Sequence, residues 1–181
     1  YDIGIDQSLA EGRALVSVTA FLRNTTDQIN FDNATFTFGN IDRTRAKGVE
    51  ATLALRPVDA LNVTASYSYI DARDRSGRPA FDGKRLPRRA DHAVSLSADY
   101  DWSFGLSTGA TITMVGDSFD NASNTVRLDG YALAGVRASF AITERIEVYG
   151  RVDNLFDADY ATAFNYGTYG RAAYGGVRAR F

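Results

Sequence analysis

A two-residue alternation of apolar and polar side chains dominates this chain of 181 residues. From Leu61 to Tyr69, the odd-numbered residues are apolar or aromatic, and the even-numbered residues between them are small and polar. The same alternation recurs around Leu96, Ile112 and Val148. Strict alternation places the two sets on opposite faces of an extended strand, and no segment shows the 3.6-residue period of an amphipathic helix. The sequence therefore predicts an all-β fold.

The links between the predicted strands alternate in length. We expect about nine strands, centred near residues 5, 18, 50, 66, 96, 110, 134, 149 and 176. Short turns are expected at 10–12, 57–59, 102–105 and 142–144, and long polar links at 24–38, 71–89, 117–125 and 157–169. An up-and-down antiparallel sheet has this pattern when tight hairpins lie at one end and loops at the other.

Two features favour lipid as the environment of the apolar face. The polar face carries charged residues such as Glu50, Asp99 and Arg151 among many Ser and Thr, as a water-filled interior would. Aromatic residues gather towards strand ends, for example Tyr69 and Trp102, where an interfacial girdle would lie. Because lipid offers no hydrogen-bond partners, such a sheet has to close into a transmembrane barrel. A soluble β-sandwich or solenoid is the alternative.

Composition argues against several other classes of protein. No window approaches the roughly 18 apolar residues of a membrane-spanning helix, and the net charge of -2 does not suggest a nucleic-acid partner. There is no Cys, and the single His92 has the parity of Leu96, so neither a zinc site nor a catalytic role is expected. Asp117, Asp120 and Asn121 could bind calcium, but their spacing is not that of an EF-hand loop, and a solvated loop is expected. We predict no cofactor, no metal and no enzymatic activity.

The last eight residues, YGGVRARF, follow the pattern polar-x-Gly-x-x-apolar-x-aromatic. The pattern positions are Tyr174, Gly176, Ala179 and Phe181. This ending resembles the assembly signal of bacterial outer-membrane barrels, in which a terminal aromatic residue anchors the strand at the membrane interface. Ala179 is smaller than the usual residue. The resemblance implies the barrel-assembly machinery as a partner.

Three pairs of segments resemble the C-terminal part of TonB-dependent outer-membrane receptors, and most of all the vitamin B12 (cobalamin) receptors. The pairs are DQINFD (27–32) with RAKGVEA (45–51), YSYIDAR (67–73) with LPRRA (86–90), and NLFDADYAT (154–162) with YGTYGR (166–171). In order and spacing, the resemblance extends over the whole chain.

This resemblance implies a barrel of about 22 strands that is filled by an N-terminal plug domain. Residues 1–181 would form the C-terminal part of the barrel domain, about its last nine strands, without the plug or the first strands. An odd number of antiparallel strands cannot close alone, so the rest of the same receptor is an expected partner and the chain alone is not expected to transport.

The implied function is that of an active importer in the bacterial outer membrane, with cobalamin as its ligand. The implied partners are membrane lipid and, through the plug, the TonB complex. A receptor for a siderophore or another ligand is one alternative. A small autonomous barrel that acts as an adhesin, a structural protein or a lipid-modifying enzyme is the other.

We expect ligand contacts in the loop after NLFD. The candidates are Phe164, Asn165, Tyr166, Tyr169 and Arg171. Aromatic rings can cover a large corrin-like face, and an arginine can bind a phosphate or an amide carbonyl.

Other residues in the matching segments have structural interpretations. Gly48 is expected to relieve crowding at a bend in its strand. Asn154 and Asp157 are expected to hold a turn through side-chain to backbone hydrogen bonds. A solvated charged network is expected around the 71–89 link, and its members are Asp71, Arg73, Arg88 and Arg89.

Overall fold

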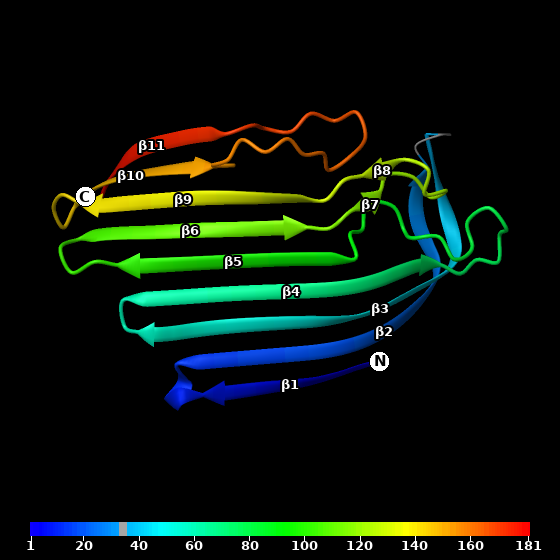
Figure 1. The fold of residues 1–181 in the computed structure, drawn as a ribbon, viewed down its shortest axis with the longest axis horizontal. Coiled ribbons are helices and arrows are strands. Elements are labelled where there is room, and N and C mark those ends of the chain that lie inside the picture. Colours follow the sequence, from blue (N-terminus) through cyan, green and yellow to red (C-terminus); the bar gives the residue numbers. More distant parts are fainter. Residues whose placement is uncertain (33–35) are drawn as a thin grey trace.

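The computed structural model describes residues 1–32 and 36–181, and its main feature is an antiparallel sheet of nine strands in which neighbours in the chain are neighbours in space (Figure 1). The strands are β1 (Asp2–Leu9), β2 (Ala14–Asp32), β3 (Thr37–Val58), β4 (Leu61–Asp74), β5 (His92–Asp101), β6 (Leu106–Val115), β9 (Tyr131–Ala141), β10 (Ile146–Asp153) and β11 (Ala172–Ala179). The predicted all-β fold and its nine antiparallel strands are confirmed.

Three short elements complete the described structure. A one-turn 3-10 helix, η1 (Ala10–Gly12), joins β1 to β2, and a separate two-stranded sheet pairs β7 (Ser118–Phe119) with β8 (Arg127–Leu128). The sequence analysis did not predict β7 and β8, since two residues are too few to show an alternation. Among the described residues, no helix is long and apolar enough to span a membrane.

The register joins the apolar positions of successive strands into one continuous face. We call it the apolar face, and it includes Leu53, Ala65, Leu96 and Ile112, which pair in turn across β3, β4, β5 and β6. The opposite face, which we call the polar face, includes Thr52, Ser66, Ser95 and Thr113, which pair across the same strands. The alternation in the sequence therefore predicted both faces correctly.

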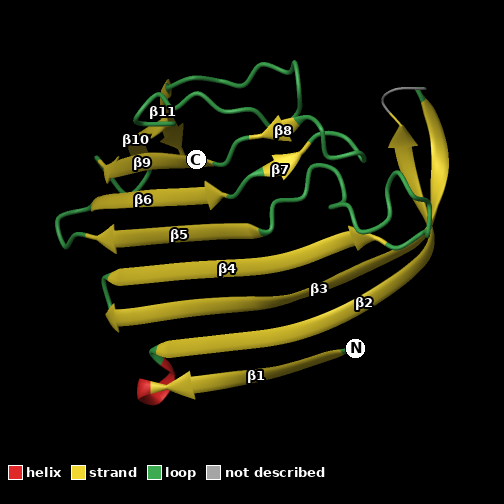
Figure 2. Ribbon diagram, turned by 45° about the vertical axis from the view of Figure 1, so that its right-hand side comes forward, coloured by secondary structure: helices red, strands yellow, loops and turns green. Residues whose placement is uncertain are grey.

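Short turns and long links lie at opposite ends of the sheet (Figure 1). The predicted long link at 24–38 is wrong in its extent, because β2 continues to Asp32 and β3 begins at Thr37. The two strands form an arm that bends away from the sheet (Figure 2), in which Phe31 pairs with Phe38 and also contacts Phe36. Residues 33–35 of the predicted link lie outside the described residues. The link after β4 is also shorter than predicted, since β4 runs to Asp74.

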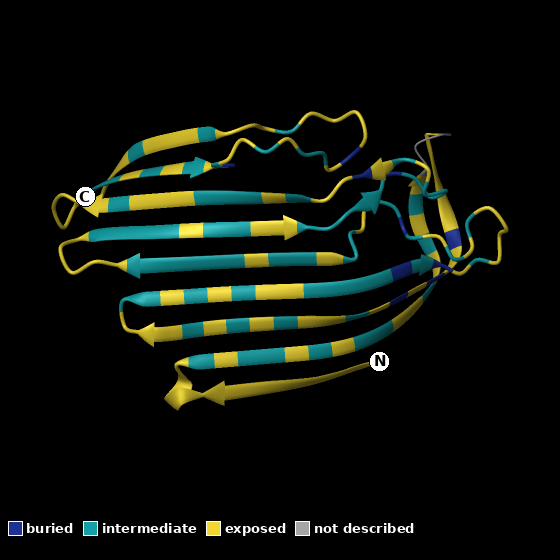
Figure 3. Cartoon of the chain, in the orientation of Figure 1, coloured by how far each residue is buried: buried dark blue, intermediate teal, exposed yellow. Residues whose placement is uncertain are grey.

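A small hydrophobic core lies on the polar face at the long-link end of the sheet (Figure 3). Its buried members are Ile41, Ala46, Ala72 and Leu86, and Phe21 and Ile70 pack against them. Leu86 belongs to the 75–91 segment, so this core fixes that segment above the sheet. By contrast, large residues of the apolar face such as Val136 and Val177 are exposed.

Candidate functional site

A cavity of about 640 Å³ lies at the long-link end, between the β2–β3 arm, the 75–91 segment and the 116–130 segment. Its volume is in the range of small-molecule sites. Its lining combines aromatic rings, amides and charged groups, among them Phe31, Phe81, Asn30, Asn40, Arg78 and Arg88. Such a surface can contact a flat apolar body and its polar periphery at once.

Arg85 fastens the 75–91 segment to the 116–130 segment. Its backbone N–H donates to Asn124 Oδ1 over 2.8 Å, and Asn124 Nδ2 donates to the Arg85 carbonyl oxygen over 2.9 Å. Its guanidinium donates to Asp117, over 3.1 Å to Oδ2 and 2.7 Å to the carbonyl oxygen, and lies over the Phe119 ring. Arg85 Nε also lies 3.1 Å from Asp91 Oδ1, and the arginine side chain is mostly buried. Arg85 therefore fixes the position of the 75–91 segment against the 116–130 segment.

Asp120 is the point where three segments meet. Its Oδ1 accepts a hydrogen bond from Arg88 Nε over 2.7 Å and another from the Phe164 backbone N–H over 3.1 Å. The Arg88 N–H also donates to the Phe119 carbonyl oxygen over 2.7 Å. Burial raises the pKa of the Asp120 carboxyl, but the bonds from Arg88 and Phe164, together with the Arg88 charge, outweigh burial and hold its pKa below the ordinary value. Asp120 is therefore ionised at neutral pH.

The turn after β10 is held as the sequence predicts. Asn154 Oδ1 accepts the Ala158 N–H over 2.9 Å, and Asn154 Nδ2 donates to the Ala158 carbonyl oxygen over 2.9 Å. Asp157 Oδ1 accepts the Arg171 N–H over 2.7 Å and so joins the two ends of the 154–171 segment. Asn154 and Asp157 both have positive φ angles, 49° and 55°, which Asn and Asp tolerate better than most residues.

The five predicted ligand contacts all lie on the 154–171 segment and outside the described lining of the cavity. The side chains of Tyr166 and Tyr169 are 71% and 87% exposed, and that of Phe164 is half-exposed. Asn165 has a φ of 61°, and the Arg171 backbone takes part in the bond to Asp157. Their role as ligand contacts stays a prediction.

Sequence reasoning missed most of the cavity residues. Asn30, Phe31 and Asn40 fall within the 24–38 link or just beyond it, and Phe81 lies in the variable 75–91 segment. Ile29 and Phe31 alternate with Gln28 and Asn30, and this pattern was the available signal for an extended strand. It does not show which other segments of the chain lie opposite that strand.

The predicted charged network is divided in two. Asp71 pairs with Arg73 on β4 and lies 3.8 Å from Lys47 on β3. Arg88 instead pairs with Asp120, 32 positions away, and no ion pair involves Arg89 among the described residues. The interpretation as one network is therefore wrong, because the loop fold carries Arg88 towards a different carboxylate.

His92 begins β5 on the apolar face, where its Nδ1 lies 2.9 Å from the Tyr67 hydroxyl and its ring is 5.0 Å from that of Tyr69. Asp117 and Asp120, considered above as calcium ligands, are engaged by Arg85 and Arg88. In residues 1–32 and 36–181, no cluster of His, Asp and Glu could hold a metal ion.

The predicted assembly residues divide between the two faces of β11. Tyr174 and Gly176 pair with Arg151 and Tyr149 of β10 on the polar face, and the Arg151 guanidinium lies 4.6 Å from the Tyr174 ring centre. A Cβ on Gly176 would lie 2.6 Å from Tyr149 Oη, so the glycine makes room for that side chain. Ala179, at the end of β11, pairs with Ile146 on the apolar face, and Phe181 is fully exposed.

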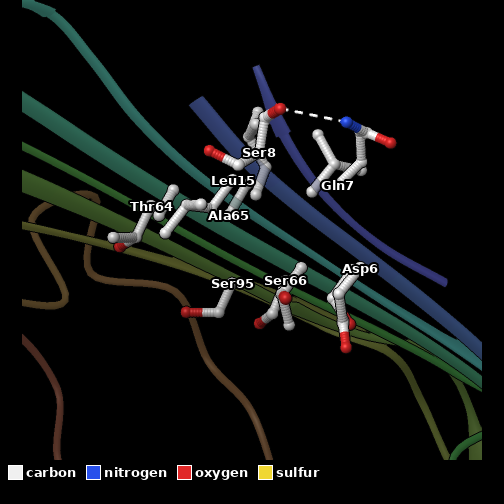
Figure 4. A pocket seen from close by; sticks show the side chains of 13 residues that line it. Asp6, Gln7, Ser8, Leu15, Thr64, Ala65, Ser66 and Ser95 are labelled. Atoms are coloured by element: carbon white, nitrogen blue, oxygen red, sulfur yellow. Dashed lines mark hydrogen bonds between the residues drawn. The ribbon is translucent and has the colours of Figure 1, made fainter. Parts of the chain in front are cut away.

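A second cavity, of about 700 Å³, lies on the polar face towards the short-turn end (Figure 4). Its lining mixes small polar residues, including Asp6 from β1, Ser66 from β4 and Ser95 from β5, with aliphatic residues such as Leu15 and Ala54. Further along the same face, Arg137 of β9 reaches Asp99 of β5 over Gly109, which has no side chain to block the ion pair. Outside the small hydrophobic core, the polar face therefore carries polar and charged side chains from β1 to β9.

Residues 1–155 match the family described as TonB dependent receptor-like, beta-barrel. Among solved structures, the ferric-catecholate import receptor Fiu from K12 E. coli superposes with a TM-score of 0.80 and 24% sequence identity, over 99% of this chain and 27% of that one. The siderophore receptor PiuA from Acinetobacter baumannii superposes with a TM-score of 0.82 and 22% sequence identity, over 98% of this chain and 28% of that one. The copper transporter OprC superposes with a TM-score of 0.76 and 18% sequence identity, over 99% of this chain and 30% of that one. The chain thus spans less than a third of each structure, and at these identities the likeness shows the fold alone.

Proposed function

Because the chain belongs to the TonB-dependent receptor β-barrel family of the bacterial outer membrane, we propose that the whole protein is an active importer that captures a bulky metal complex at its long-link end. The nine-stranded sheet is part of the barrel wall, and residues 1–181 supply this wall together with outer loops. The family consists of transporters rather than enzymes, and the proposed role involves no bond chemistry.

The proposed partners follow from the faces and edges of the sheet. The apolar face meets membrane lipid, and the polar face meets the plug, through which the TonB complex supplies energy. The free edges of β1 and β11 pair with the remaining strands of the receptor. The barrel-assembly machinery recognises the C-terminal strand with Tyr174, Gly176, Ala179 and Phe181.

The observation that carries the ligand proposal is the cavity of about 640 Å³ between the loops. Cobalamin is the first candidate, since the corrin ring has an amide-rich periphery that Asn30 and Asn40 can match. The rings of Phe31 and Phe81 supply apolar contact. Cobalamin is larger than the drug-sized ligands that fill cavities of this volume, so the cavity would hold part of it and the exposed 154–171 segment would cover the rest.

A ferric siderophore is the second candidate, favoured by the charge of the 75–91 segment. This segment carries six basic residues and two acidic ones, so its net charge is +4. Two of the basic residues, Arg78 and Arg88, line the cavity, where they pair with Asp74 and Asp120. Each guanidinium has five N–H donors, so these pairs leave donors that can bind an anion. Ferric catecholates are anionic, and charge-assisted bonds from arginine would stabilise them.

Direct binding measurements separate the two candidates. Purified, folded full-length receptor should bind cyanocobalamin with a dissociation constant on the order of nanomolar to micromolar. Phe81→Ala should weaken this binding by about tenfold, because a ring contact is lost. Asp129→Ala, an exposed site outside the cavity lining, is the matched control.

Binding of a ferric catecholate with no binding of cyanocobalamin would replace the first candidate by the second. In that case Arg78→Ala should weaken binding more than Phe81→Ala. If neither compound binds the folded receptor, the proposal of a metal complex at this site is wrong, while the family assignment stands.

A further inference from the structure

We propose that Asp120 is a positioning residue that couples the 75–91 segment to the 154–171 segment. The 154–171 segment, which carries the predicted ligand contacts, is then held in place by a residue of the cavity lining. A single oxygen, Asp120 Oδ1, accepts from Arg88 of the first segment and from the Phe164 backbone of the second. Asp120 and Arg88 both line the cavity. A ligand that contacts Arg88 therefore acts on the bond that holds the other loop.

The attachment of the 154–171 segment to the neighbouring loops depends on few contacts. Within the part of the chain that the structure describes, the Phe164 bond to Asp120 is its only hydrogen bond to the 116–130 segment, and it has none to the 75–91 segment. The Tyr160 ring packs against Tyr131, 4.8 Å away, at the start of β9. Next to Phe164, Ala163 is buried, so this bond holds the segment where it turns inward.

Asp117 provides an internal comparison. Like Asp120, it lies on the 116–130 segment and pairs with an arginine of the 75–91 segment, here Arg85. Unlike Asp120, it has no bond to the 154–171 segment among the described residues. Loss of Asp117 should loosen the first two segments from each other without releasing Phe164.

The two bonds to Asp120 should also depend on each other. Arg88 Nε donates to the same Asp120 Oδ1 that accepts from Phe164, and the Arg88 backbone N–H is held by the Phe119 carbonyl oxygen, so Arg88 fixes the direction in which the carboxylate points. Without Arg88 the carboxylate is free to rotate away from the Phe164 N–H. Removal of Arg88 should therefore weaken the Phe164 bond, although Arg88 does not touch Phe164. A residue that merely fills space would not transmit such an effect.

Amide hydrogen exchange in the purified full-length receptor, without any ligand, tests this coupling at the Phe164 N–H. Asp120→Ala should accelerate exchange there by about ten- to a hundredfold, because a bond to a charged acceptor is lost. Asp120→Asn, which keeps an acceptor oxygen, and Arg88→Ala should give smaller accelerations in the same direction. Asp117→Ala should leave the exchange of this amide unchanged. Amides of β5 and β6 should stay protected in every variant, which shows that the barrel is folded.

Two results would overturn the coupling. One is that Arg88→Ala leaves Phe164 exchange at the wild-type rate while Asp120→Ala accelerates it. Asp120 would then hold the 154–171 segment independently of the 75–91 segment. The other is that Asp117→Ala accelerates it as much as Asp120→Ala, which would indicate general loosening. Only the role of this coupling in ligand capture rests on the proposed function. Because the experiment contains no ligand, its failure and a failure of the binding measurements are distinguishable.

Discussion

At Gly48, the middle of β3 passes too close to its neighbours to carry a side chain. A Cβ at this position would overlap the Tyr69 carbonyl oxygen and lie 2.8 Å from Phe21 Cζ. The predicted role of Gly48 in relieving crowding agrees with this geometry. Gly39 lies in the same strand, and a Cβ there would meet open space. The pair thus separates the effect of crowding from the general effect of replacing a glycine in a strand.

We expect Gly48→Ala to lower the free energy of unfolding of the full-length barrel by about 1–3 kcal/mol, because the backbone of β4 has to shift. Gly39→Ala should change it by no more than about 0.5 kcal/mol. Denaturant titrations of the folded receptor, followed by Trp fluorescence, measure both. Equal effects of the two substitutions would contradict the steric argument.

The lowered pKa of Asp120 predicts how the loops respond to acid. A carboxyl with a lowered pKa in the folded state stabilises the fold above its ordinary pKa, and this contribution is lost as the pH falls through the lowered value. The charged group that bonds to Asp120 is Arg88, and Asp74 and Arg78 line the same cavity. The Asp120 contribution should thus be complete at neutral pH.

We expect the 154–171 segment to stay attached between pH 7 and pH 5 and to loosen only below the ordinary carboxyl pKa of 3.8. A spin label at the exposed Thr162 of the full-length receptor would report its mobility. In Asp120→Ala the label should be mobile at every pH. A label that is released near pH 6 in the wild-type receptor would show that another group controls the attachment.

The range of an interaction decides whether sequence reasoning can find it. The bonds of Asn154 to Ala158 span four positions and involve residue types with a strong preference for turns, so they could be predicted. The bond from Phe164 to Asp120 spans 44 positions and depends on the course of two loops. No local pattern carries that information, and the cavity could not be predicted for the same reason.

At the scale of elements, the alternation of side chains predicted the nine strands because each strand has two faces in different surroundings. The β2–β3 arm does not follow this rule. Ile29 and Phe38 are both exposed, and Asp27 has a φ of 54°. Beyond the buried Ile41, residues 36–40 of the arm are all exposed. This outer part has no buried face, so alternation there does not reflect two different surroundings.

The two faces of the sheet should respond differently to a new charge. Val63 and Ser66 lie near each other on β4, with Val63 on the apolar face and Ser66 on the polar face. We expect Val63→Arg to destabilise the inserted receptor by about 2–4 kcal/mol near the bilayer midplane, because lipid cannot solvate the charge. Ser66→Arg should have a much smaller effect. The yield of folded receptor in membranes and its stability to denaturant measure the difference, and the opposite order would invert the assignment of the faces.

At the scale of the molecule, the sheet has two open edges, β1 and β11. Each edge presents unpaired backbone groups, which lipid cannot satisfy and which favour association in water. With nine strands in antiparallel order, β1 and β11 run in the same direction. They therefore cannot pair with each other in the antiparallel arrangement that the rest of the sheet has. Closure requires further strands.

We accordingly expect residues 1–181, expressed alone, not to form a closed barrel. The isolated segment should aggregate or be degraded and should show no heat-dependent change of mobility in gel electrophoresis, whereas the full-length receptor should show one. Supplying the other strands of the proposed receptor barrel as a separate chain should restore the change in part, because they would pair with both edges at once. A folded, heat-modifiable monomer of residues 1–181 alone would contradict the argument and would favour the alternative of a small autonomous barrel.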